Sequence, residues 1–161
     1  MRNAVLCFLV KREEGQTKDV LLAMKKRGFG QGKWNAPGGK IEDAKNEDWE
    51  EAVARETKEE IGVNPVDLYK VAELTFLFPN KKEWNQLVHV YICEEWEGEP
   101  KESEEMKPQW FKKEEIPYNN MFGADIFWVP KILSGKKVKV IVVYDNDYHV
   151  LDQTHDTVEK L

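Results

Sequence analysis

The stretch that decides the fold is Gly38–Val63, which reads GGKIEDAKNEDWEEAVARETKEEIGV. It places three carboxylates, Glu56, Glu59 and Glu60, at positions i, i+3 and i+4. On an α-helix this spacing stacks side chains on one side, so the segment predicts a helix with a row of acids along it. Gly62 follows as a residue that can end such a helix.

The acids of this helix are expected to face the protein. At about 100° per residue, Glu56 and Glu60 fall in the sector that also holds the apolar side chains, Trp49, Ala52 and Val53. The solvent face is expected elsewhere, near Glu47, Glu51 and Lys58. Arg55 stands at the edge of that face, one turn before Glu59, and can pair with it.

Carboxylates that crowd a protein-facing sector require a positive partner. Like charges one turn apart repel, and an anion turned toward low-dielectric protein is costly. A hard divalent cation fits best, because oxygen ligands without histidine or cysteine suit Mg²⁺ or Mn²⁺. Mg²⁺ also keeps coordination positions open for water and substrate phosphate. The alternative is an acid-rich helix whose charges are simply solvated.

The order of residues in this stretch resembles the Nudix box, usually written G-x5-E-x7-R-E-U-x-E-E-x-G-U with U aliphatic. From Glu47 onward the spacing matches residue for residue. There are two departures. Seven residues rather than five separate Gly39 from Glu47, and Thr57 stands where an aliphatic residue is usual. Neither departure touches the acids.

The composition is that of one ordinary soluble domain, which we assign to residues 1–161. Apolar residues make up 41% of the chain and the mean hydropathy is −0.65, which allows a real core. A net charge of −6 argues against binding to a nucleic-acid backbone. The apolar run 4–10 is too short to span a membrane. We therefore expect a monomer, without nucleic-acid or membrane partners, that handles a small metal-bound polyanion.

The two cysteines, Cys7 and Cys93, lie in apolar, strand-like runs. A reduced, buried thiol is the expected state there, because a disulfide would need an oxidising compartment. We therefore expect the protein to be cytoplasmic.

Short β-branched and aliphatic runs on both sides of the helix predict strands, at 4–10, 19–24, 68–78, 86–94, 107–112, 138–144 and 148–151. The turn between 68–78 and 86–94 favours an antiparallel pair. A second helix is predicted over 121–133, where Pro130 must kink it or shift its start. Together these elements predict an α/β (α+β) fold in which a mixed β-sheet is sandwiched between helices.

The segment Lys25–Gly39, KKRGFGQGKWNAPGG, combines five glycines with Phe29 and Trp34. One interpretation is an exposed glycine-rich loop. We favour the other, in which Gly38 and Gly39 bring the backbone close to phosphate or metal while the two aromatic side chains pack the wall of a pocket.

The resemblance extends over nearly the whole chain to one branch of the Nudix hydrolases, the MutT-like 8-oxo-dGTP diphosphatases. The resembling pieces are the box, MKKRGFGQGKWN at 24–35, the run 104–108 with Trp110 and Phe111, and the segment 116–130. The fold that this resemblance implies agrees with the predicted sandwich.

The resemblance implies a site with two ends. Its metal and phosphate end would comprise Gly38, Glu56, Glu59, Glu60 and Glu105, with Arg55 beside them and Lys25, Gly39 and Lys40 contacting substrate. Its base pocket would comprise Phe29, Asn35, Phe76, Met106, Phe122 and Asp125. The implied cofactor is Mg²⁺, with Mn²⁺ as the alternative. The identity of the general base stays open between Glu56 and Glu105.

The chain departs from its animal relatives in the base pocket. Where they have a tryptophan, a proline and two adjacent aspartates, it has Phe122, Gly123, Ala124 and Asp125. With one aspartate only, we expect purine recognition that is weaker and less selective. Asp125 has two interpretations: it caps the second helix, or it faces the base pocket.

The reaction implied is hydrolysis of a metal-bound nucleoside triphosphate, such as 8-oxo-dGTP, to the monophosphate and pyrophosphate. Such an enzyme removes damaged nucleotides. A second hypothesis is another Nudix substrate, either an unmodified dNTP or a nucleoside diphosphate derivative. A third is a ligand-sensing module without catalysis, whose usual signature is the loss of box acids that this chain retains.

Overall fold

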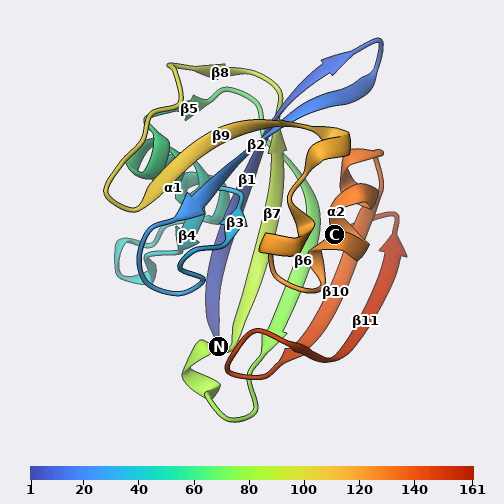
Figure 1. Ribbon diagram of the computed structural model, residues 1–161. Coiled ribbons are helices and arrows are strands. Elements are labelled where there is room, and N and C mark those ends of the chain that lie inside the picture. Colours follow the sequence, from blue (N-terminus) through green and yellow to red (C-terminus); the bar gives the residue numbers. More distant parts are fainter.

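The structure of the protein, a computed structural model, describes the backbone of residues 1–161 and every side chain except that of Ala44. A mixed β-sheet runs through the molecule between two helices, α1 (Trp49–Ile61) and α2 (Asp125–Leu133) (Figure 1). Short 3-10 helices lie at Asp43–Lys45, Lys82–Trp84, Lys113–Glu115 and Tyr118–Asn120. The predicted α+β sandwich is confirmed.

The strands, in chain order, are β1 (Arg2–Glu13), β2 (Gln16–Lys25), β3 (Trp34–Asn35), β4 (Gly38–Lys40), β5 (Asn64–Pro65), β6 (Tyr69–Leu77), β7 (Gln86–Cys93), β8 (Trp96–Glu97), β9 (Met106–Lys112), β10 (Lys137–Tyr144) and β11 (Val150–Val158). The main sheet has the order β11-β10-β6-β7-β1-β2-β3. In addition, β4 pairs with β1, β9 pairs with β2, and β5 and β8 form a separate pair.

The sheet is mixed because two of its pairings are parallel. The predicted antiparallel pairing of β6 and β7 is confirmed. By contrast, β1 lies parallel to β7, and β10 lies parallel to β6. The strands of each parallel pair are distant in the chain, so no tight turn between them could have predicted the pairing from the sequence.

The two faces of β1 belong to two apolar cores, as the alternation of side chains along a strand requires. Val5, Cys7 and Leu9 pack with the buried face of α1. Phe8 and Val10 pack on the other face, in the core that includes α2. The thiols of Cys7 and Cys93 are buried and free, as predicted.

Helix α1 begins and ends at residues suited to those positions. The Asp48 side chain accepts a hydrogen bond from the Glu51 N–H at 2.8 Å, which caps the start. Gly62 ends the helix with a φ of 74°, a left-handed conformation that favours glycine. One orientation prediction is wrong: Trp49 is 41% exposed, because it lies in the first turn and stacks on the ring of His89.

The glycine-rich segment is not an exposed loop throughout, since it contains β3 and β4. Strand β4 pairs with β1 so that Gly38 lies opposite Leu6 and Gly39 opposite Val5. A Cβ on Gly38 would collide with the backbone oxygen of Val5. The absence of a side chain at Gly38 therefore lets β4 pack against β1, and the predicted approach of this backbone to phosphate or metal stays a prediction.

The second helix is shorter than predicted. It begins at Asp125 rather than at residue 121, because the 3-10 helix Tyr118–Asn120 ends at an extended Met121. Pro130 lies inside the helix. The C-terminal hairpin is confirmed, but β11 continues to Val158, well beyond the predicted 148–151.

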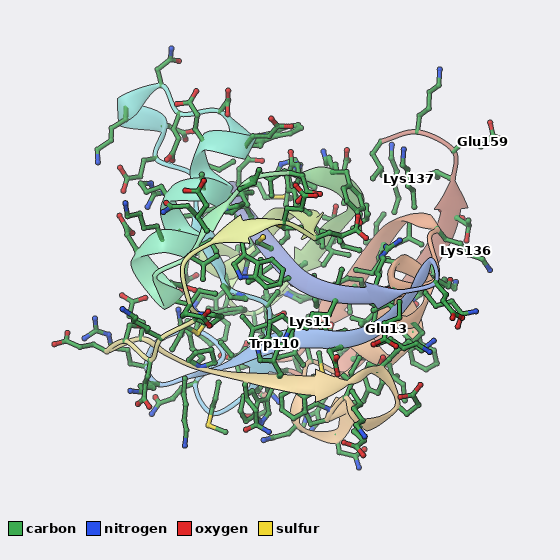
Figure 2. All side chains as sticks on the ribbon, turned by 90° about the horizontal axis from the view of Figure 1, so that it is seen from above. Lys11, Glu13, Trp110, Lys136, Lys137 and Glu159 are labelled. Atoms are coloured by element: carbon green, nitrogen blue, oxygen red, sulfur yellow. The ribbon has the colours of Figure 1, made fainter. Side chains whose placement is uncertain are left out.

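A lysine of β1 and a tryptophan of β9 contact each other across β2. Lys11 of β1 places its Nζ 4.2 Å from the ring centroid of Trp110 on β9 (Figure 2). Among the described residues, no helix is both long and apolar enough to cross a membrane.

Candidate active site

One cavity of about 920 Å³ brings the two predicted ends of the site together. All the predicted site residues except Asp125 line it: Lys25, Phe29, Asn35, Gly38, Gly39, Lys40, Arg55, Glu56, Glu59, Glu60, Phe76, Glu105, Met106 and Phe122. Its lining includes residues of β4, of α1 and of the segment joining β2 to β3, and these elements lie on the left in Figure 1.

Arg55 organises the carboxylates at the predicted metal and phosphate end of the cavity, which we call the acid end; the end with the predicted base pocket is called the base end. Its Nε donates to Glu47 Oε1 at 2.6 Å, and its Nη1 donates to Glu56 at 2.9 Å and to Glu59 at 3.1 Å. Its Nη2 also donates to the Lys40 carbonyl at 2.9 Å. These acids raise the pKa of Arg55, so one permanent cation holds three acids and a strand end together.

The predicted orientation of Glu47 is wrong. We expected it on the solvent face of the helix, but it precedes α1 and its side chain is only 7% exposed. The hydrogen bonds from Arg55 hold its pKa below the usual range. The helical-wheel argument failed because Asp48 is the cap, so Glu47 never joins the helix.

Glu60 is the most buried of the box acids, with its side chain 3% exposed. It accepts a hydrogen bond from the Gly38 N–H at 3.0 Å, and Lys25 Nζ lies 3.9 Å from its other oxygen. Burial raises the pKa of Glu60 to about 7, although Gly38 and Lys25 oppose the rise. Burial also raises the pKa of Glu56, and the negative charges nearby add to it.

Glu59 differs from its two neighbours. Its side chain is 59% exposed, at the rim of the cavity, where it meets Arg55. The prediction that three acids crowd one protein-facing sector therefore holds for Glu56 and Glu60 only. The reason is the geometry of the helix, because position i+3 is rotated by about 60° from position i.

Gly39 provides the room for the Glu56 carboxylate. A Cβ at this position would collide with the carboxyl carbon and both oxygens of Glu56. Backbone and acid thus approach more closely than any other residue type at position 39 would permit.

Glu105 reaches the cavity from a different segment. Its oxygens lie 3.8 Å from Lys25 Nζ and 3.3 Å from Arg27 Nη2. The Ser103 hydroxyl accepts from the N–H groups of Glu105 and Met106, at 3.3 and 3.2 Å, which shapes the turn into β9. Glu105 is therefore held near the box acids by cations of the β2 end.

The donor set fits a hard divalent cation. Two carboxylates with raised pKa values, the buried Glu60 and the partly buried Glu56, lie at one end of the cavity, and the absence of a side chain at Gly39 leaves room for the second of them. Among the described residues, the one trio of potential ligand side chains with donor atoms all within 4.8 Å of one another is Asp145, Asp147 and His149, in an exposed turn. The box glutamates form a looser set, with Arg55 and Lys25 among their carboxylates.

The base end of the cavity is aromatic. Phe29 and Phe122 stack with their ring centroids 5.6 Å apart and their planes at 19°, and Phe76 lies 6.2 Å from Phe122. The side-chain oxygen Oδ1 of Asn35 accepts a hydrogen bond from the Ala36 N–H at 2.8 Å. The side-chain NH₂ group of Asn35 takes no part in this bond. This end therefore offers flat apolar surface with a few polar groups, as a nucleobase requires.

Asp125 lies beside the cavity rather than on its lining. Its side chain is 2% exposed, and its Oδ1 accepts from Trp128 Nε1 at 3.1 Å. Burial raises the pKa of Asp125 to about 7, although that hydrogen bond opposes the rise. The capping interpretation is wrong, since Ala124 is the N-cap residue and Asp125 lies in the first turn. Its predicted contact with a base stays a prediction.

Sequence reasoning missed several residues of the lining. Lys33 follows the glycines near the base end, and Gln86 and Val88 come from β7. The parallel pairing with β1 brings β7 here, placing Gln86 opposite Arg2 and Val88 opposite Ala4. No local pattern signals this pairing, whereas Lys33 could have been found from its place in the glycine-rich segment.

This fold and this cluster of acids define a Nudix hydrolase. The NUDIX domain family matches residues 1–128, and the chain belongs to that family. It is 40% identical to an oxidized purine nucleoside triphosphate hydrolase of Danio rerio over 142 residues, which are 88% of this chain and 89% of the relative. It is 42% identical to the protein of the same name in Mus musculus over 122 residues, 76% of each chain.

A solved structure supports the same assignment. The crystal structure of a mutator MutT protein from Bacillus halodurans superposes with a TM-score of 0.82 at 27% identity. The superposition covers 97% of this chain and 98% of the other. The similarity therefore includes the C-terminal hairpin as well as the box.

Proposed function

We propose that this protein hydrolyses oxidised purine nucleoside triphosphates, such as 8-oxo-dGTP, to the monophosphate and pyrophosphate, and so clears damaged nucleotides. The observation that carries the proposal is the single cavity, with the box acids at one end and the Phe29–Phe122 pair at the other. A triphosphate and a base can occupy these two ends together. The names of the two animal relatives point to the same substrate class.

Members of the Nudix family typically use a divalent metal, and we propose Mg²⁺ here, held by Glu56 and Glu60 with Glu59, Glu105 and the Gly38 backbone around them. Bound there, the ion would neutralise the triphosphate and make its phosphorus more electrophilic. Lys25, Lys40 and Arg55 supply further positive charge on the cavity wall. Because the net charge is −6, this local positive charge is what favours a polyanion.

The hydrolytic step needs a base beside the attacking water. As the water oxygen bonds to phosphorus, the bond to the pyrophosphate oxygen breaks and the water proton passes to a carboxylate. Glu56 and Glu105 both line the cavity and are candidates for this carboxylate. Comparing Glu56→Gln with Glu105→Gln over a range of Mg²⁺ concentrations separates them: the variant that lacks the base keeps a low kcat at every concentration, whereas a variant that lacks only a metal ligand regains kcat as Mg²⁺ rises.

A panel of nucleotides with Mg²⁺ tests the proposal. It should include 8-oxo-dGTP, dGTP, dCTP and a nucleoside diphosphate derivative, with release of pyrophosphate and of orthophosphate measured separately. We expect pyrophosphate and monophosphate as products and the highest kcat/KM for the oxidised purine. Orthophosphate as the main product, or a preference for the diphosphate derivative, would contradict the proposal.

A further inference from the structure

The connection between β10 and β11 brings an aromatic ring to the base end of the cavity. This connection lies beyond residues 1–128, the part of the chain that the NUDIX family matches. The ring of Tyr148 stands perpendicular to both Phe29 and Phe122, with centroid distances of 5.3 and 5.2 Å. Because Phe29 and Phe122 stack on each other, one ring from the C-terminal hairpin contacts both walls of the pocket.

The hydroxyl of Tyr148 adds a directional contact. It accepts a hydrogen bond from the Gly30 N–H at 3.2 Å, next to Phe29 in the segment that lines the cavity. Trp84 stacks on the Tyr148 ring at 5.7 Å and 13°, which holds the ring from outside. Tyr148 is not among the described residues that line the cavity, so it acts on the walls rather than on the contents.

The backbone of Tyr148 adopts a conformation that is unfavourable for a residue with a large side chain. Its φ is 65°, in the left-handed region where glycine would be less strained. Asp145 stabilises the turn: its Oδ1 accepts from the N–H groups of Asp147 and His149, at 2.8 and 2.9 Å, and its Oδ2 lies 3.0 Å from His149 Nδ1. A tyrosine therefore occupies a turn position at which glycine would be less strained.

We infer that Tyr148 is a positioning residue for the base pocket: through Phe29, Gly30 and Phe122 it fixes the position of the stacked aromatic pair against which the base binds. This inference rests on the function proposed above. It places the specificity of the site partly in the C-terminal hairpin, outside the box helix. Phosphate and metal affinity, which depend on groups at the other end, do not depend on it.

The inference is tested by replacing the ring and the hydroxyl separately. Tyr148→Phe removes the acceptor for Gly30, and Tyr148→Leu also removes the flat ring but keeps apolar volume. Calorimetry should measure Kd for 8-oxo-dGMP, which carries a base, and for Mg²⁺ pyrophosphate, which does not. We expect Kd for 8-oxo-dGMP to rise about threefold in Tyr148→Phe and roughly tenfold in Tyr148→Leu. Kd for Mg²⁺ pyrophosphate should stay within about twofold of the wild-type value. In turnover, KM for 8-oxo-dGTP should rise and kcat should stay near that of the wild type.

Tyr91→Phe is the matched control, because it removes a hydroxyl from a buried tyrosine on the α1 face of the sheet. Thermal melting verifies that each variant folds. If Tyr148→Leu does not fold, the Kd values of Tyr148→Phe alone test the inference. Unchanged Kd values in the folded variants, or parallel weakening of both ligands, would overturn the inference. A wild type that binds 8-oxo-dGMP without hydrolysing 8-oxo-dGTP would instead refute the proposed function, and the binding measurements would still test Tyr148. A wild type that neither binds 8-oxo-dGMP nor hydrolyses 8-oxo-dGTP would overturn both.

Discussion

The acid end of the cavity comes mostly from one continuous segment, Gly38 to Glu60, whereas the base end is assembled from strands and loops spread along the chain. At the acid end, α1 and β4 place each carboxylate by local geometry, and Arg55 holds three of them. At the base end, the walls are Phe29, Phe76 and Phe122, from three different segments. Chemistry that depends on helical spacing is thus built locally, while recognition of the base depends on how distant segments pack.

This difference has a consequence for substitutions. A change at the acid end removes charge from a preorganised cluster and should affect every substrate alike. A change at the base end alters packing and should affect one substrate more than another. The predictions below compare the two ends, beginning with the largest effect.

Removing one acid should have the largest effect. For Glu60→Gln we expect turnover to fall by roughly a hundredfold or more, because a strong electrostatic group is lost. All nucleotides should be affected to a similar degree, and EDTA should abolish activity. The fold should survive, since a buried carboxylate with a raised pKa is replaced by a neutral group. Steady-state rates with and without EDTA measure this, and full activity in EDTA would refute a metal site.

At the base end, the buried carboxyl of Asp125 should make stability depend on pH. Burial raises its pKa to about 7 from 3.8, so the folded state holds a proton that the unfolded state releases. This contribution is fully present below pH 3.8 and is lost as pH rises through 7. Between pH 5 and pH 7 the wild type should therefore lose about 2 kcal/mol relative to Asp125→Asn. Denaturant titrations of both proteins at several pH values measure the difference, and parallel curves would contradict it.

The same residue should also affect selectivity. If Asp125 exchanges its bond with Trp128 for one with a purine, Asp125→Ala and Asp125→Asn should each change the kcat/KM ratio of 8-oxo-dGTP to dGTP by roughly tenfold. Kinetics with both nucleotides measure the ratio. Rates and ratio that stay within about twofold would leave Asp125 as a structural residue buried against Trp128.

The smallest effect should follow from uncapping α1. Asp48→Ala removes the hydrogen bond to the Glu51 N–H. We expect the melting temperature to fall by about 3 °C, while kcat and the ratio between substrates stay unchanged, because Arg55 and Gly39 still hold the carboxylates. Calorimetric melting and kinetics check the two parts. A large fall in kcat would mean that the acid end depends on the start of the helix more than its local contacts indicate.

The sequence predicted the acid end well, apart from the orientations of Glu47, Trp49 and Glu59. The row of acids along one helix and Gly62 as the end of α1 both follow from spacing within one segment, whereas the close approach of Gly39 to Glu56 was found only in the structure. Glu47 and Trp49 were misplaced because the helix starts two residues after Glu47, and helix boundaries are the least reliable feature of a periodic pattern.

The base end could be predicted only in part. The resemblance to the family suggested the aromatic residues, and the structure brings Phe29, Phe76 and Phe122 together. It did not suggest Lys33 or Tyr148, and it did not reveal that Asp125 bonds to Trp128. Tyr148 contacts Phe29 and Phe122 from a segment far along the chain, and nothing in the spacing of the residues encodes that contact. The bond between Asp125 and Trp128 spans three residues of α2, so helical spacing permits it, but the burial of both side chains depends on the tertiary structure.

The sequence by itself determined the elements whose causes are local: the helix of the box, the strands with alternating apolar residues, and the carboxylates for a divalent cation. The tertiary structure alone decided which strands lie in parallel, how buried each glutamate is, and which ring contacts both Phe29 and Phe122. The physical reason is that helix spacing and strand alternation act over a few residues, whereas desolvation and aromatic packing depend on every segment that surrounds a group. A pKa near 7 at Glu60, and a tyrosine that contacts both walls of the pocket, exist only once the chain is folded.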